Sequence, residues 1–470
     1  MRSRDCKIVA TLGPASDAPE RLTMVLDAGV DCFRLNFSHG ARAEHARRIA
    51  AIREAEQRIG RPIAIIADLQ GPKLRVGDIA GGAMPLRYGE TVRLEASSEP
   101  AEAGIIRLPH PEILEALEPG DTLKLDDGKM QLTVLGANGS GKDARVDFGG
   151  ELKSRKGVNV PSRRIPISAL TAQDKEHLAF ALDEGVDFIA LSFVQSAQDI
   201  HEARALIADR AGIVAKIEKP AALDELGEIV SLSDAVMVAR GDLGVELPPE
   251  QVPIAQRRII RVARILGRPV IVATHMLESM IDAPTPTRAE ASDVATAVYQ
   301  GADAVMLSAE SAVGRHPATA VAIMDRIIRA VESDPDHWAA LERDAARPEH
   351  TTADAIAQSA RAIAEVLDAA RVVAYTATGS TALRLSRERP RCGILGMTPR
   401  VETARRLCLA WGVRSVVTED AHDTEDMVTK AEACVRALGL ADVDDRIVIT
   451  AGVPFGRPGK TNMIRIVRLE

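Results

Sequence analysis

The sequence lacks any apolar run of the length that a membrane crossing needs. None of its segments approaches the roughly 18 consecutive apolar residues of a membrane span. The first residues, MRSRDCKIVATLG, contain no apolar segment long enough for a signal peptide. We therefore expect a protein without a membrane partner that resides in the cytoplasm.

Cysteine is scarce, and its spacing excludes the usual cysteine-based architectures. The five cysteines are odd in number, scattered and without metal-ligand spacing: Cys6, Cys32, Cys392, Cys408 and Cys434. This pattern suits a reducing compartment better than a disulfide framework. We expect buried thiols rather than metal ligands.

Positive charge is also in deficit. The chain carries 59 Lys and Arg against 67 Asp and Glu, a formal net charge of -8. This balance argues against a nucleic-acid partner held by bulk electrostatics, although a local basic pocket for small anions remains open. With 46% hydrophobic residues, the 470-residue chain can fill the cores of two to four domains.

Short runs rich in Val and Ile alternate with helical patterns along much of the chain. Several helices end in the similar phrases DAGVD, DEGVD and YQGAD, in which a glycine closes the helix before the next strand. Eight such strands are expected at 7–13, 32–38, 62–69, 187–194, 212–218, 234–243, 268–276 and 303–310. Because parallel strands buried on both faces are continuously apolar, this pattern predicts a parallel (β/α)8 TIM barrel. A doubly wound open sheet is the alternative.

Two regions do not fit the barrel pattern. From Lys73 to Ile165 the sequence becomes turn-rich and alternating, as in DTLKLDDGKMQLTVLG, which predicts a small β-barrel domain inserted after the third strand as a lid. After Glu332 a polar stretch precedes a further strand-helix alternation, typical of a separate C-terminal α/β domain. The predicted domains are the barrel (1–72 and 166–332), the insert (73–165) and the C-terminal domain (333–470).

Polar residues gather where the predicted barrel strands end, which is where barrel enzymes carry their active sites. Solvent exposure explains any one of them, but nearly every strand contributes. The residues are Arg34, Asn36, Ser38, Asp68, Ser192, Lys216, Glu218, Arg240, Asp242, Thr274, Ser308 and Glu310.

Glu218 and Asp242 lie on adjacent predicted strands and could offer oxygens to one hard cation. Mg²⁺ or Mn²⁺ is favoured because no His or Cys accompanies them; salt bridges to Lys216 or Arg240 are the alternative. Lys216, two residues before Glu218, points into the same mouth, where an ammonium group neutralises a transferring phosphoryl group or an enolate. Otherwise it only balances the carboxylates. RGDLGVEL, residues 240–247, predicts a turn opening a short helix that favours an anion.

Ordered sequence blocks resemble those of the pyruvate kinase family. They are RLNFSHG, DLQGPKLRVG, LDDGK, KGVNVP, DFIALSFV, AKIE, MVARGDLGVEL, ATHMLESM, PTRAEASDVATAV, DAVMLSAESAVGRHP, TATGSTALRLSRERP and AGVPFGRPGKTN. The resemblance covers essentially the whole chain. It implies a phosphotransferase that moves the phosphoryl group of phosphoenolpyruvate to ADP and then protonates the enol, giving pyruvate and ATP in the last step of glycolysis.

The resemblance also implies roles for the residues at the mouth. Glu218 and Asp242 would hold the divalent metal, Mg²⁺ or Mn²⁺. Lys216 would steady the phosphoryl group in transfer and the enolate after it, and Arg34 would reach the substrate phosphate. Charge neutralisation and alignment are what phosphoryl transfer requires.

Further roles follow from the same resemblance for the substrate carboxylate and the proton. The Thr274 hydroxyl, with the backbone at Gly241 and Asp242, would bind the carboxylate, and Thr274 would help to deliver the proton. Ser308 and Glu310 would support that proton path.

For the nucleotide, the resemblance implies that Arg75 and Lys156 meet the phosphates of ADP, with His39 and Asn36 near the nucleotide. Two other functions stay open from the sequence. One is a substrate-sensing protein without catalysis, and the other is a different metal-dependent barrel acting on pyruvate-like acids, such as an aldolase or lyase.

The stretch YTATGSTALRL suggests an effector site in the C-terminal domain. Thr376, Thr378, Ser380 and Thr381 surround a glycine between a strand and a helix, an arrangement that makes a phosphate cradle or, alternatively, an ordinary capped turn. The family resemblance implies a homotetramer whose C-terminal domain receives a phosphorylated allosteric effector.

A last expectation concerns potassium. Asn36, Ser38 and Asp68 resemble the oxygen ligands with which many pyruvate kinases bind K⁺ beside the substrate phosphate. The potassium-dependent pattern has threonine, lysine, glutamate and threonine where this chain has Leu69, Gln70, Lys73 and Val76. Lys73 would supply an attached cation, so K⁺ would not be required; the alternative is a surface lysine at the hinge of the insert.

Overall fold

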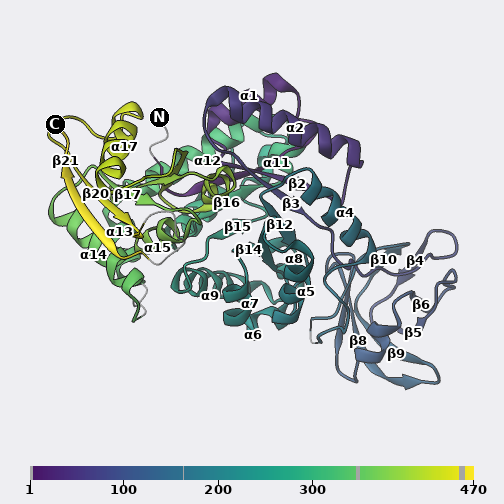
Figure 1. The fold of residues 1–470 in the computed structure, drawn as a ribbon. Coiled ribbons are helices and arrows are strands. Elements are labelled where there is room, and N and C mark those ends of the chain that lie inside the picture. Colours follow the sequence, from purple (N-terminus) through teal and green to yellow (C-terminus); the bar gives the residue numbers. More distant parts are fainter. Residues whose placement is uncertain (1–3, 162, 346–349, 455–460) are drawn as a thin grey trace.

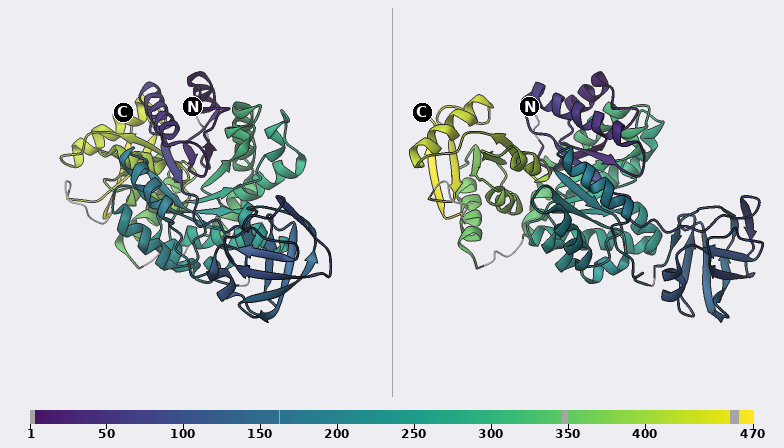
Figure 2. Two further views of the ribbon diagram at one scale, coloured as in Figure 1. Left: turned by 90° about the vertical axis from the view of Figure 1, so that its right-hand side faces the viewer. Right: turned by 45° about the vertical axis from the view of Figure 1, so that its right-hand side comes forward.

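The structure is a computed structural model that describes residues 4–161, 163–345, 350–454 and 461–470. It has three regions in a row: the C-terminal domain, the barrel in the centre and the inserted β domain at the far end (Figure 1; Figure 2, right). The insert leaves the barrel after its third strand, as expected, and the exact domain boundaries stay predictions.

The central region is a closed barrel of eight parallel strands, in the order β1-β16-β15-β14-β13-β12-β3-β2. This confirms the predicted TIM barrel and excludes the open sheet. Every strand coincides with one of the eight apolar runs, and their apolar residues are buried. The strands are β1 (Lys7–Thr11), β2 (Cys32–Asn36), β3 (Ala64–Asp68), β12 (Phe188–Leu191), β13 (Gly212–Ile217), β14 (Ala235–Ala239), β15 (Val270–Ala273) and β16 (Ala304–Leu307).

The helices around the barrel begin and end where local signals are strong. In front of α4, the Thr171 hydroxyl accepts the N–H of Asp174 at 3.1 Å, and the Asp174 carboxylate accepts the N–H of Thr171 at 3.0 Å. Gly185 and Gly301, at φ 73° and 88°, supply the left-handed residue after α4 and α10. The helices are α1 (Pro19–Ala28), α2 (Arg42–Ile59), α4 (Ala172–Asp183), α5 (Ala197–Ile207), α6 (Pro220–Asp224), α7 (Leu226–Leu232), α8 (Arg240–Glu246), α9 (Val252–Ile265), α10 (Arg288–Tyr299), α11 (Ala309–Ala312), α12 (Pro317–Glu332) and α13 (Pro335–Arg343), with short 3-10 turns at Pro249–Gln251 and Glu278–Ile281.

The insert is a β domain, as predicted, with its own apolar core around Leu94, Leu123 and Leu132. Its strands pair as a six-stranded sheet, β11-β7-β8-β9-β5-β6, and a two-stranded sheet, β10-β4. The elements are β4 (Ala83–Leu86), β5 (Thr91–Ala96), β6 (Ile105–Leu108), α3 (Pro111–Ala116), β7 (Thr122–Leu125), β8 (Met130–Asn138), β9 (Gly141–Phe148), β10 (Gly150–Lys153) and β11 (Val158–Asn159).

The C-terminal α/β domain contains a five-stranded sheet in the order β19-β18-β17-β20-β21. The last strand, β21, runs antiparallel to β20 and so departs from the predicted strand-helix alternation, although MIRIVR alternates as an edge strand does. Residues 455–460 of the block AGVPFGRPGKTN lie outside the described residues. The elements are α14 (Thr352–Val366), β17 (Arg371–Tyr375), α15 (Ser380–Glu388), β18 (Ile394–Thr398), α16 (Val401–Arg406), β19 (Val413–Val417), α17 (Thr424–Ala437), β20 (Arg446–Ala451) and β21 (Met463–Arg468), with a 3-10 turn at Leu407–Leu409.

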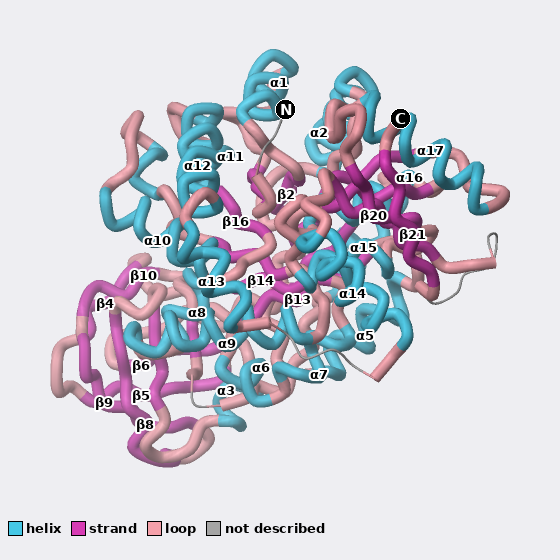
Figure 3. Tube along the Cα trace, turned by 90° about the vertical axis from the view of Figure 1, so that its left-hand side faces the viewer, coloured by secondary structure: helices cyan, strands magenta, loops and turns pink. Residues whose placement is uncertain are grey.

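The C-terminal domain covers the N-terminal end of the barrel, as the view from its side shows (Figure 3). The Lys7 ammonium donates to the carbonyl of Val413 at 2.8 Å, and the Cys408 thiol donates to the carbonyl of Pro62 at 3.4 Å. Cys408 and its neighbour Leu409 belong to the apolar cluster that fills the barrel interior. This end of the barrel is therefore closed by protein.

The cysteines are free thiols, as predicted from their spacing. Cys6, Cys32 and Cys408 are buried, and Cys392 and Cys434 are half-buried. Among the described residues, no helix is long and apolar enough to cross a membrane.

Candidate active site

Strand geometry brings four charged side chains together at the C-terminal end of the barrel. Alternate residues of a strand share one face, so Arg34, Asp68, Lys216 and Glu218 all point inward from β2, β3 and β13. Arg34 Nε lies 2.6 Å from the Asp68 carboxylate, and Lys216 Nζ lies 3.2 Å from Asp68 and 2.9 Å from Glu218. The sequence-predicted residues thus form one buried network.

The network keeps its lysine charged. Burial alone would lower the pKa of Lys216, but the charges of Asp68 and Glu218 outweigh it and raise the pKa above its usual range. Burial would raise the pKa of Asp68, yet Lys216 and Arg34 hold it below its usual value. Lys216 also donates to the Ser192 hydroxyl at 2.7 Å, which fixes the direction of the ammonium group.

Glu218 and Asp242 lie close enough to repel one another. Burial, and then the charge of Asp242, raise the pKa of Glu218 to about 6, against the pull of Lys216. The N–H of Phe193 donates to Glu218 at 2.7 Å and orients the carboxylate. Because two carboxylates that repel each other are stabilised by a hard cation, this donor set fits Mg²⁺ or Mn²⁺. The alternative to a metal site, a salt bridge to Lys216, is also present for Glu218.

Thr274 follows β15 in a strained turn. Thr274 and His275 adopt φ values of 66° and 54°, which β-branched Thr rarely does. The Thr274 hydroxyl accepts the N–H of Gly241 at 2.7 Å and donates to the carbonyl of Ala273 at 2.7 Å. The turn therefore brings Thr274 to Gly241, the two groups expected to share the substrate carboxylate.

Arg240 stabilises the turn at Thr274. Its guanidinium donates to the carbonyl of Thr274 at 2.6 Å and pairs with Asp293, from α10, at 2.6 Å. Arg240 does not pair with Asp242, so the second predicted salt-bridge alternative is not realised. Arg240 positions the backbone rather than the metal carboxylates.

Glu310 joins the loops after β15 and β16. Its two carboxylate oxygens accept the N–H of Leu277 at 3.1 Å and of Ser308 at 2.7 Å, and Glu310 is buried. These contacts make Glu310 a positioning residue for both loops, and its part in a proton path stays a prediction, as does that of half-buried Ser308.

A recess of about 490 Å³, open to solvent, lies between the barrel mouth and the insert. Asp242 and Phe193 line it from the barrel, Asp127 from the insert, and Lys73 from the segment that joins them. Lys73 is exposed and pairs with no carboxylate of the described chain. Its place in the recess agrees with both readings of Lys73, as an attached cation and as a hinge lysine.

Of the predicted nucleotide and potassium residues, Lys73 lines that recess, and the others lie on the insert or in and after β2 and β3. On the insert side, Arg75 donates to the carbonyl of Arg155 at 3.0 Å, and Lys156 pairs with Asp126 at 2.8 Å. On the barrel side, His39 and Ser38 are exposed in the loop after β2, and the Asn36 side chain accepts the N–H of Ser38 at 3.1 Å. The described contacts do not join the two groups directly.

Sequence reasoning did not foresee the contacts of three residues that shape the site. Ser192 was noted only as a polar strand end, although it accepts a hydrogen bond from Lys216. Thr11 accepts from Arg34 at 3.2 Å, and its inward position at the end of β1 was readable from the strand period. Phe193 acts through its N–H at φ 56°, for which the sequence contains no signal.

The expected effector cradle is a turn with both bonded and exposed hydroxyls. Thr376 and Thr381 are buried: Thr376 accepts the N–H of Gly379 at 3.0 Å, and Thr381 lies 2.7 Å from the hydroxyl of Thr461. Thr378, in front of α15, and Ser380, its first residue, are exposed. Part of the cradle is thus closed by internal hydrogen bonds, although no side chain caps α15, and the exposed hydroxyls of Thr378 and Ser380 remain accessible.

Two protein-family models match the chain. The model described as pyruvate kinase, barrel domain, matches residues 3–321, and the one described as pyruvate kinase, alpha/beta domain, matches residues 354–467. A solved structure of a pyruvate kinase from Cryptosporidium parvum is similar at a TM-score of 0.94 and 33% identity, covering 99% of this chain and 96% of the other.

Relatives with the same name are considerably closer in sequence. A pyruvate kinase of Methylorubrum extorquens is 52% identical over 465 residues, 99% of this chain and 97% of the relative. A pyruvate kinase of Agrobacterium vitis is 50% identical, covering 99% of this chain and 98% of the relative. With its closed barrel, inserted β domain and converging charges, the chain belongs to the pyruvate kinase family of phosphotransferases.

Proposed function

We propose that the protein transfers the phosphoryl group of phosphoenolpyruvate to ADP and protonates the resulting enol, giving pyruvate and ATP. The observation that carries the proposal is the buried group of Arg34, Asp68, Lys216 and Glu218 beside an open recess. A transferring phosphoryl group needs alignment and charge neutralisation rather than a covalent nucleophile, and this group supplies both.

Glu218 and Asp242 hold the divalent metal in this proposal. The raised pKa of Glu218 supports it, because a cation removes the repulsion that disfavours the second negative charge. Bound there, Mg²⁺ or Mn²⁺ supplies positive charge to the oxygens of the phosphate and carboxylate.

Lys216 and Arg34 act on the phosphoryl group from the barrel side. Lys216 stays charged among two carboxylates, so it neutralises the group in transfer and afterwards the enolate oxygen. Arg34 holds the substrate phosphate, oriented by Asp68 and Thr11.

Thr274 and the backbone at Gly241 and Asp242 bind the substrate carboxylate, and Thr274 helps to deliver the proton to the enol. The short contact of Thr274 with Gly241 supports this assignment, since one bound carboxylate would reach both. Ser308 and Glu310 complete the proton path, with Glu310 fixing the loop that carries Ser308.

ADP enters from the recess between the domains. Arg75 and Lys156 meet its phosphates from the insert, while His39 and Asn36 lie near the nucleotide on the barrel. Closure of the insert as a lid would bring the two sides together and exclude water.

Lys73 takes the place of K⁺ beside Asn36, Ser38 and Asp68. A unit charge about 4 Å from a phosphate oxygen is worth about 4 kcal/mol at an effective dielectric near 20, so a cation belongs there. The position of Lys73 on the recess shared with Asp242 supports the assignment.

The enzyme acts in the cytoplasm as a homotetramer and is activated by a phosphorylated metabolite at Thr376, Thr378, Ser380 and Thr381. Five free thiols suit a reducing compartment. For the effector site, Ser380→Glu is a cleaner test than Thr381→Glu, because Ser380 is exposed and Thr381 is buried.

A coupled assay for ATP formed from phosphoenolpyruvate and ADP tests the reaction. We expect turnover that requires Mg²⁺ or Mn²⁺ and persists when a tetraalkylammonium salt replaces K⁺ at matched ionic strength. Absence of ATP formation would contradict the function, whereas activity that appears only with K⁺ would contradict only the role of Lys73.

In the same assay, a sugar monophosphate or AMP should lower the phosphoenolpyruvate concentration for half-maximal rate. Ser380→Glu should abolish that response without changing the maximal rate. If no phosphorylated metabolite shifts the curve, the effector assignment fails while the enzyme assignment stands.

A further inference from the structure

A second recess lies on the opposite side of the barrel, where four arginines meet. Arg264 ends α9 and Arg268 follows it in the barrel, while Arg387 and Arg389 come from the end of α15 in the C-terminal domain. The recess measures about 220 Å³ with its solvent-open mouth included. Among its described lining residues, Asp303 is the only carboxylate.

The two arginines of the C-terminal domain have carboxylate partners. Arg389 pairs with Asp303 at 3.0 Å, and Arg387 pairs with Asp354 at 2.7 Å. Arg389 uses its Nη2 for this contact, and within the described chain its Nε and Nη1 have no hydrogen-bond partner. With only 3% of its surface exposed, Arg389 carries two buried N–H groups without an acceptor.

The two arginines of the barrel have no counterion among the residues described. Arg264 donates to the carbonyl of Leu341 at 2.8 Å and Arg268 to that of Ser231 at 2.9 Å, and neither lies within 4 Å of a described carboxylate. The Nε of each has no partner in the same part of the chain. Arg264 is 5% exposed, and the described carboxylates of Asp303, Asp344 and Glu388 act on its charge only from beyond 4 Å.

Leaving such groups unmatched is costly. A buried N–H without an acceptor loses the full free energy of its hydration, and a buried charge without a counterion loses more. Burial, and then the neighbouring charge of Arg389, lower the pKa of Arg264 to about 10. The recess is thus a preformed site for negative charge.

We propose that this recess binds a small doubly charged oxyanion, of the class of inorganic phosphate or a phosphate monoester, between Arg264, Arg268 and Arg389. Planar guanidinium groups match the oxygens of such an anion and bind them with charge-assisted hydrogen bonds. Because the arginines come from both domains, the bound anion fastens the C-terminal domain to the barrel.

This site is separate from the two sites proposed above. Asp303 and Arg268 precede β16 and β15, at the end of the barrel away from the metal carboxylates. Ser380 and Arg387 lie near opposite ends of α15, about 10 Å apart at 1.5 Å per residue. One ligand of phosphate size cannot occupy both ends of that helix.

The chain supplies an optical probe for this recess. Its only two tryptophans are Trp338 and Trp411, whose rings lie 6.0 Å apart. The Arg389 guanidinium lies 4.7 Å from the ring of Trp411. An anion on Arg389 should therefore change the intrinsic fluorescence, whereas phosphate at the other sites should not.

We would titrate inorganic phosphate into the full-length enzyme without substrates or divalent metal, with chloride holding the ionic strength constant. We expect a saturable change in tryptophan fluorescence and a rise in Tm. Arg264→Gln and Arg268→Gln should each weaken binding about tenfold or more, the loss of one charge-assisted contact. Arg261→Gln, an exposed arginine on the same helix, should bind like the wild type.

The same titration in Lys216→Met and Ser380→Glu separates this site from the others, and both should respond as the wild type does. A sugar monophosphate in place of phosphate decides between free phosphate and an ester. The proposal is overturned if the wild type responds no more to phosphate than to chloride, or if folded Arg264→Gln and Arg268→Gln both bind normally.

Discussion

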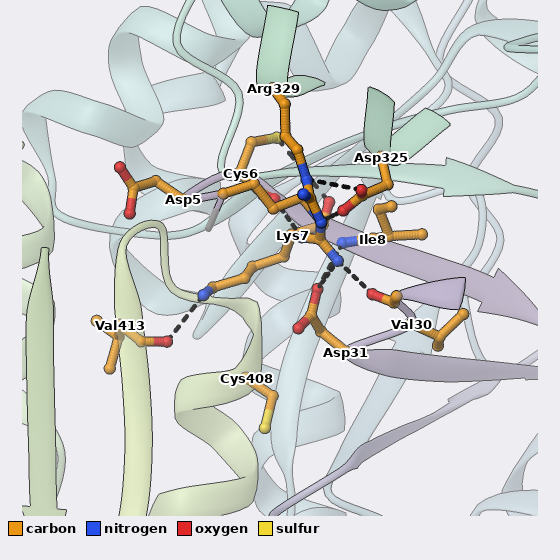
Figure 4. A network of polar contacts seen from close by, with 12 residues as sticks. Asp5, Cys6, Lys7, Ile8, Val30, Asp31, Asp325, Arg329, Cys408 and Val413 are labelled. Carbon is orange, nitrogen blue, oxygen red and sulfur yellow. Dashed lines mark hydrogen bonds and ion pairs between the residues drawn. The ribbon is translucent and has the colours of Figure 1, made fainter. Parts of the chain in front are cut away.

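The two ends of one barrel both bury charged residues, but the network around Lys216 at one end and the network around Arg4 at the other differ in their access to solvent. At the C-terminal mouth, the ion pairs around Lys216 border a recess that is open to solvent. At the N-terminal end, the pairs of Arg4 with Asp31 and Asp325 are buried, and Lys7 beside them reaches Val413 of the C-terminal domain (Figure 4). Buried charge alone is therefore no sign of function; access is the difference.

The network around Arg4 at the enclosed end is satisfied by internal contacts. Arg4 pairs with Asp31 at 2.7 Å and with Asp325 at 2.8 Å, and it also donates to backbone carbonyls. Its side chain is 1% exposed. Because these partners satisfy the guanidinium from within the protein, the network stabilises the junction and leaves nothing for a ligand.

Two lysines make the contrast sharpest. Burial lowers the pKa of Lys7, which donates to the carbonyl of Val413, more than Asp31 can raise it. The pKa of Lys216 is raised, because Asp68 and Glu218 together outweigh burial. The mouth holds its lysine charged, as phosphoryl transfer requires.

The largest expected effect is a loss of kcat when a charge at the C-terminal mouth is removed. Lys216→Met should lower kcat by about 10²–10³-fold or more, since a preorganised charge in a site shielded from water is lost. Lys7→Met is the matched control at the other end, and it should retain kcat. The coupled assay measures both, with circular dichroism to confirm folding. If folded Lys216→Met and folded Lys7→Met lost kcat to a similar extent, the proposed functional difference between the two ends would be contradicted.

The next largest effect is a loss of stability when the Arg4 network at the N-terminal end is disrupted. Arg4→Met removes the buried cation that Asp31 and Asp325 share, although Asp325 keeps its pair with Arg329 at 2.8 Å, and it should lower the free energy of unfolding by about 3 kcal/mol. The catalytic rate of the folded fraction should not change. Chemical denaturation measures the loss, and Arg468→Gln, which removes an exposed pair with Asp444, should show none. A stable but inactive Arg4→Met enzyme would contradict this assignment.

Much of this comparison was predictable at the mouth. The eight strands were predicted because strands buried on both faces are continuously apolar. Once the strands were located, the two-residue period placed Lys216 and Glu218 on one inner face. The residue spacing along a strand thus carries most of the information about the catalytic end.

The enclosed end was not predictable, because its contacts join residues distant in sequence. Cys408 closes a barrel whose first strand begins at Lys7, and no local pattern signals that packing. The same holds for Arg240 and Asp293 at the mouth. The left-handed Thr274 is a third case: its strain is imposed by tertiary contacts against the preference of a β-branched residue.

A smaller effect concerns pH at the enclosed end. Burial, and then the charge of Asp5, raise the pKa of Glu332 from its usual 4.5 to about 7, while the N–H groups of Asp5 and Cys6 bind its carboxylate. A raised pKa means that the folded protein holds the proton more tightly than the unfolded chain. The resulting stability is complete below pH 4.5 and is lost as the pH rises through 7.

Glu332→Gln should remove this dependence. Relative to the variant, the unfolding free energy of the wild type should fall by on the order of 2 kcal/mol from pH 5 to pH 8. Denaturant titrations at several pH values measure it, and kcat should stay the same. A difference that does not vary with pH would show that Glu332 titrates normally.

The smallest effect uses Cys408 as a reporter of closure. Burial, and then the charge of Asp31, raise the pKa of its thiol to about 12, so the reactive thiolate is nearly absent at neutral pH. We expect a thiol reagent to label Cys408 in the native enzyme no faster than the protein unfolds, whereas half-buried Cys434 reacts sooner. Peptide mapping of timed samples distinguishes the two sites.

Cys408→Ala should cost about 1 kcal/mol of stability and leave kcat unchanged, because it removes one buried atom far from the mouth. Rapid labelling of native Cys408 would mean that the C-terminal domain lifts from the barrel, and the contrast between an open and a closed end would then hold only on average.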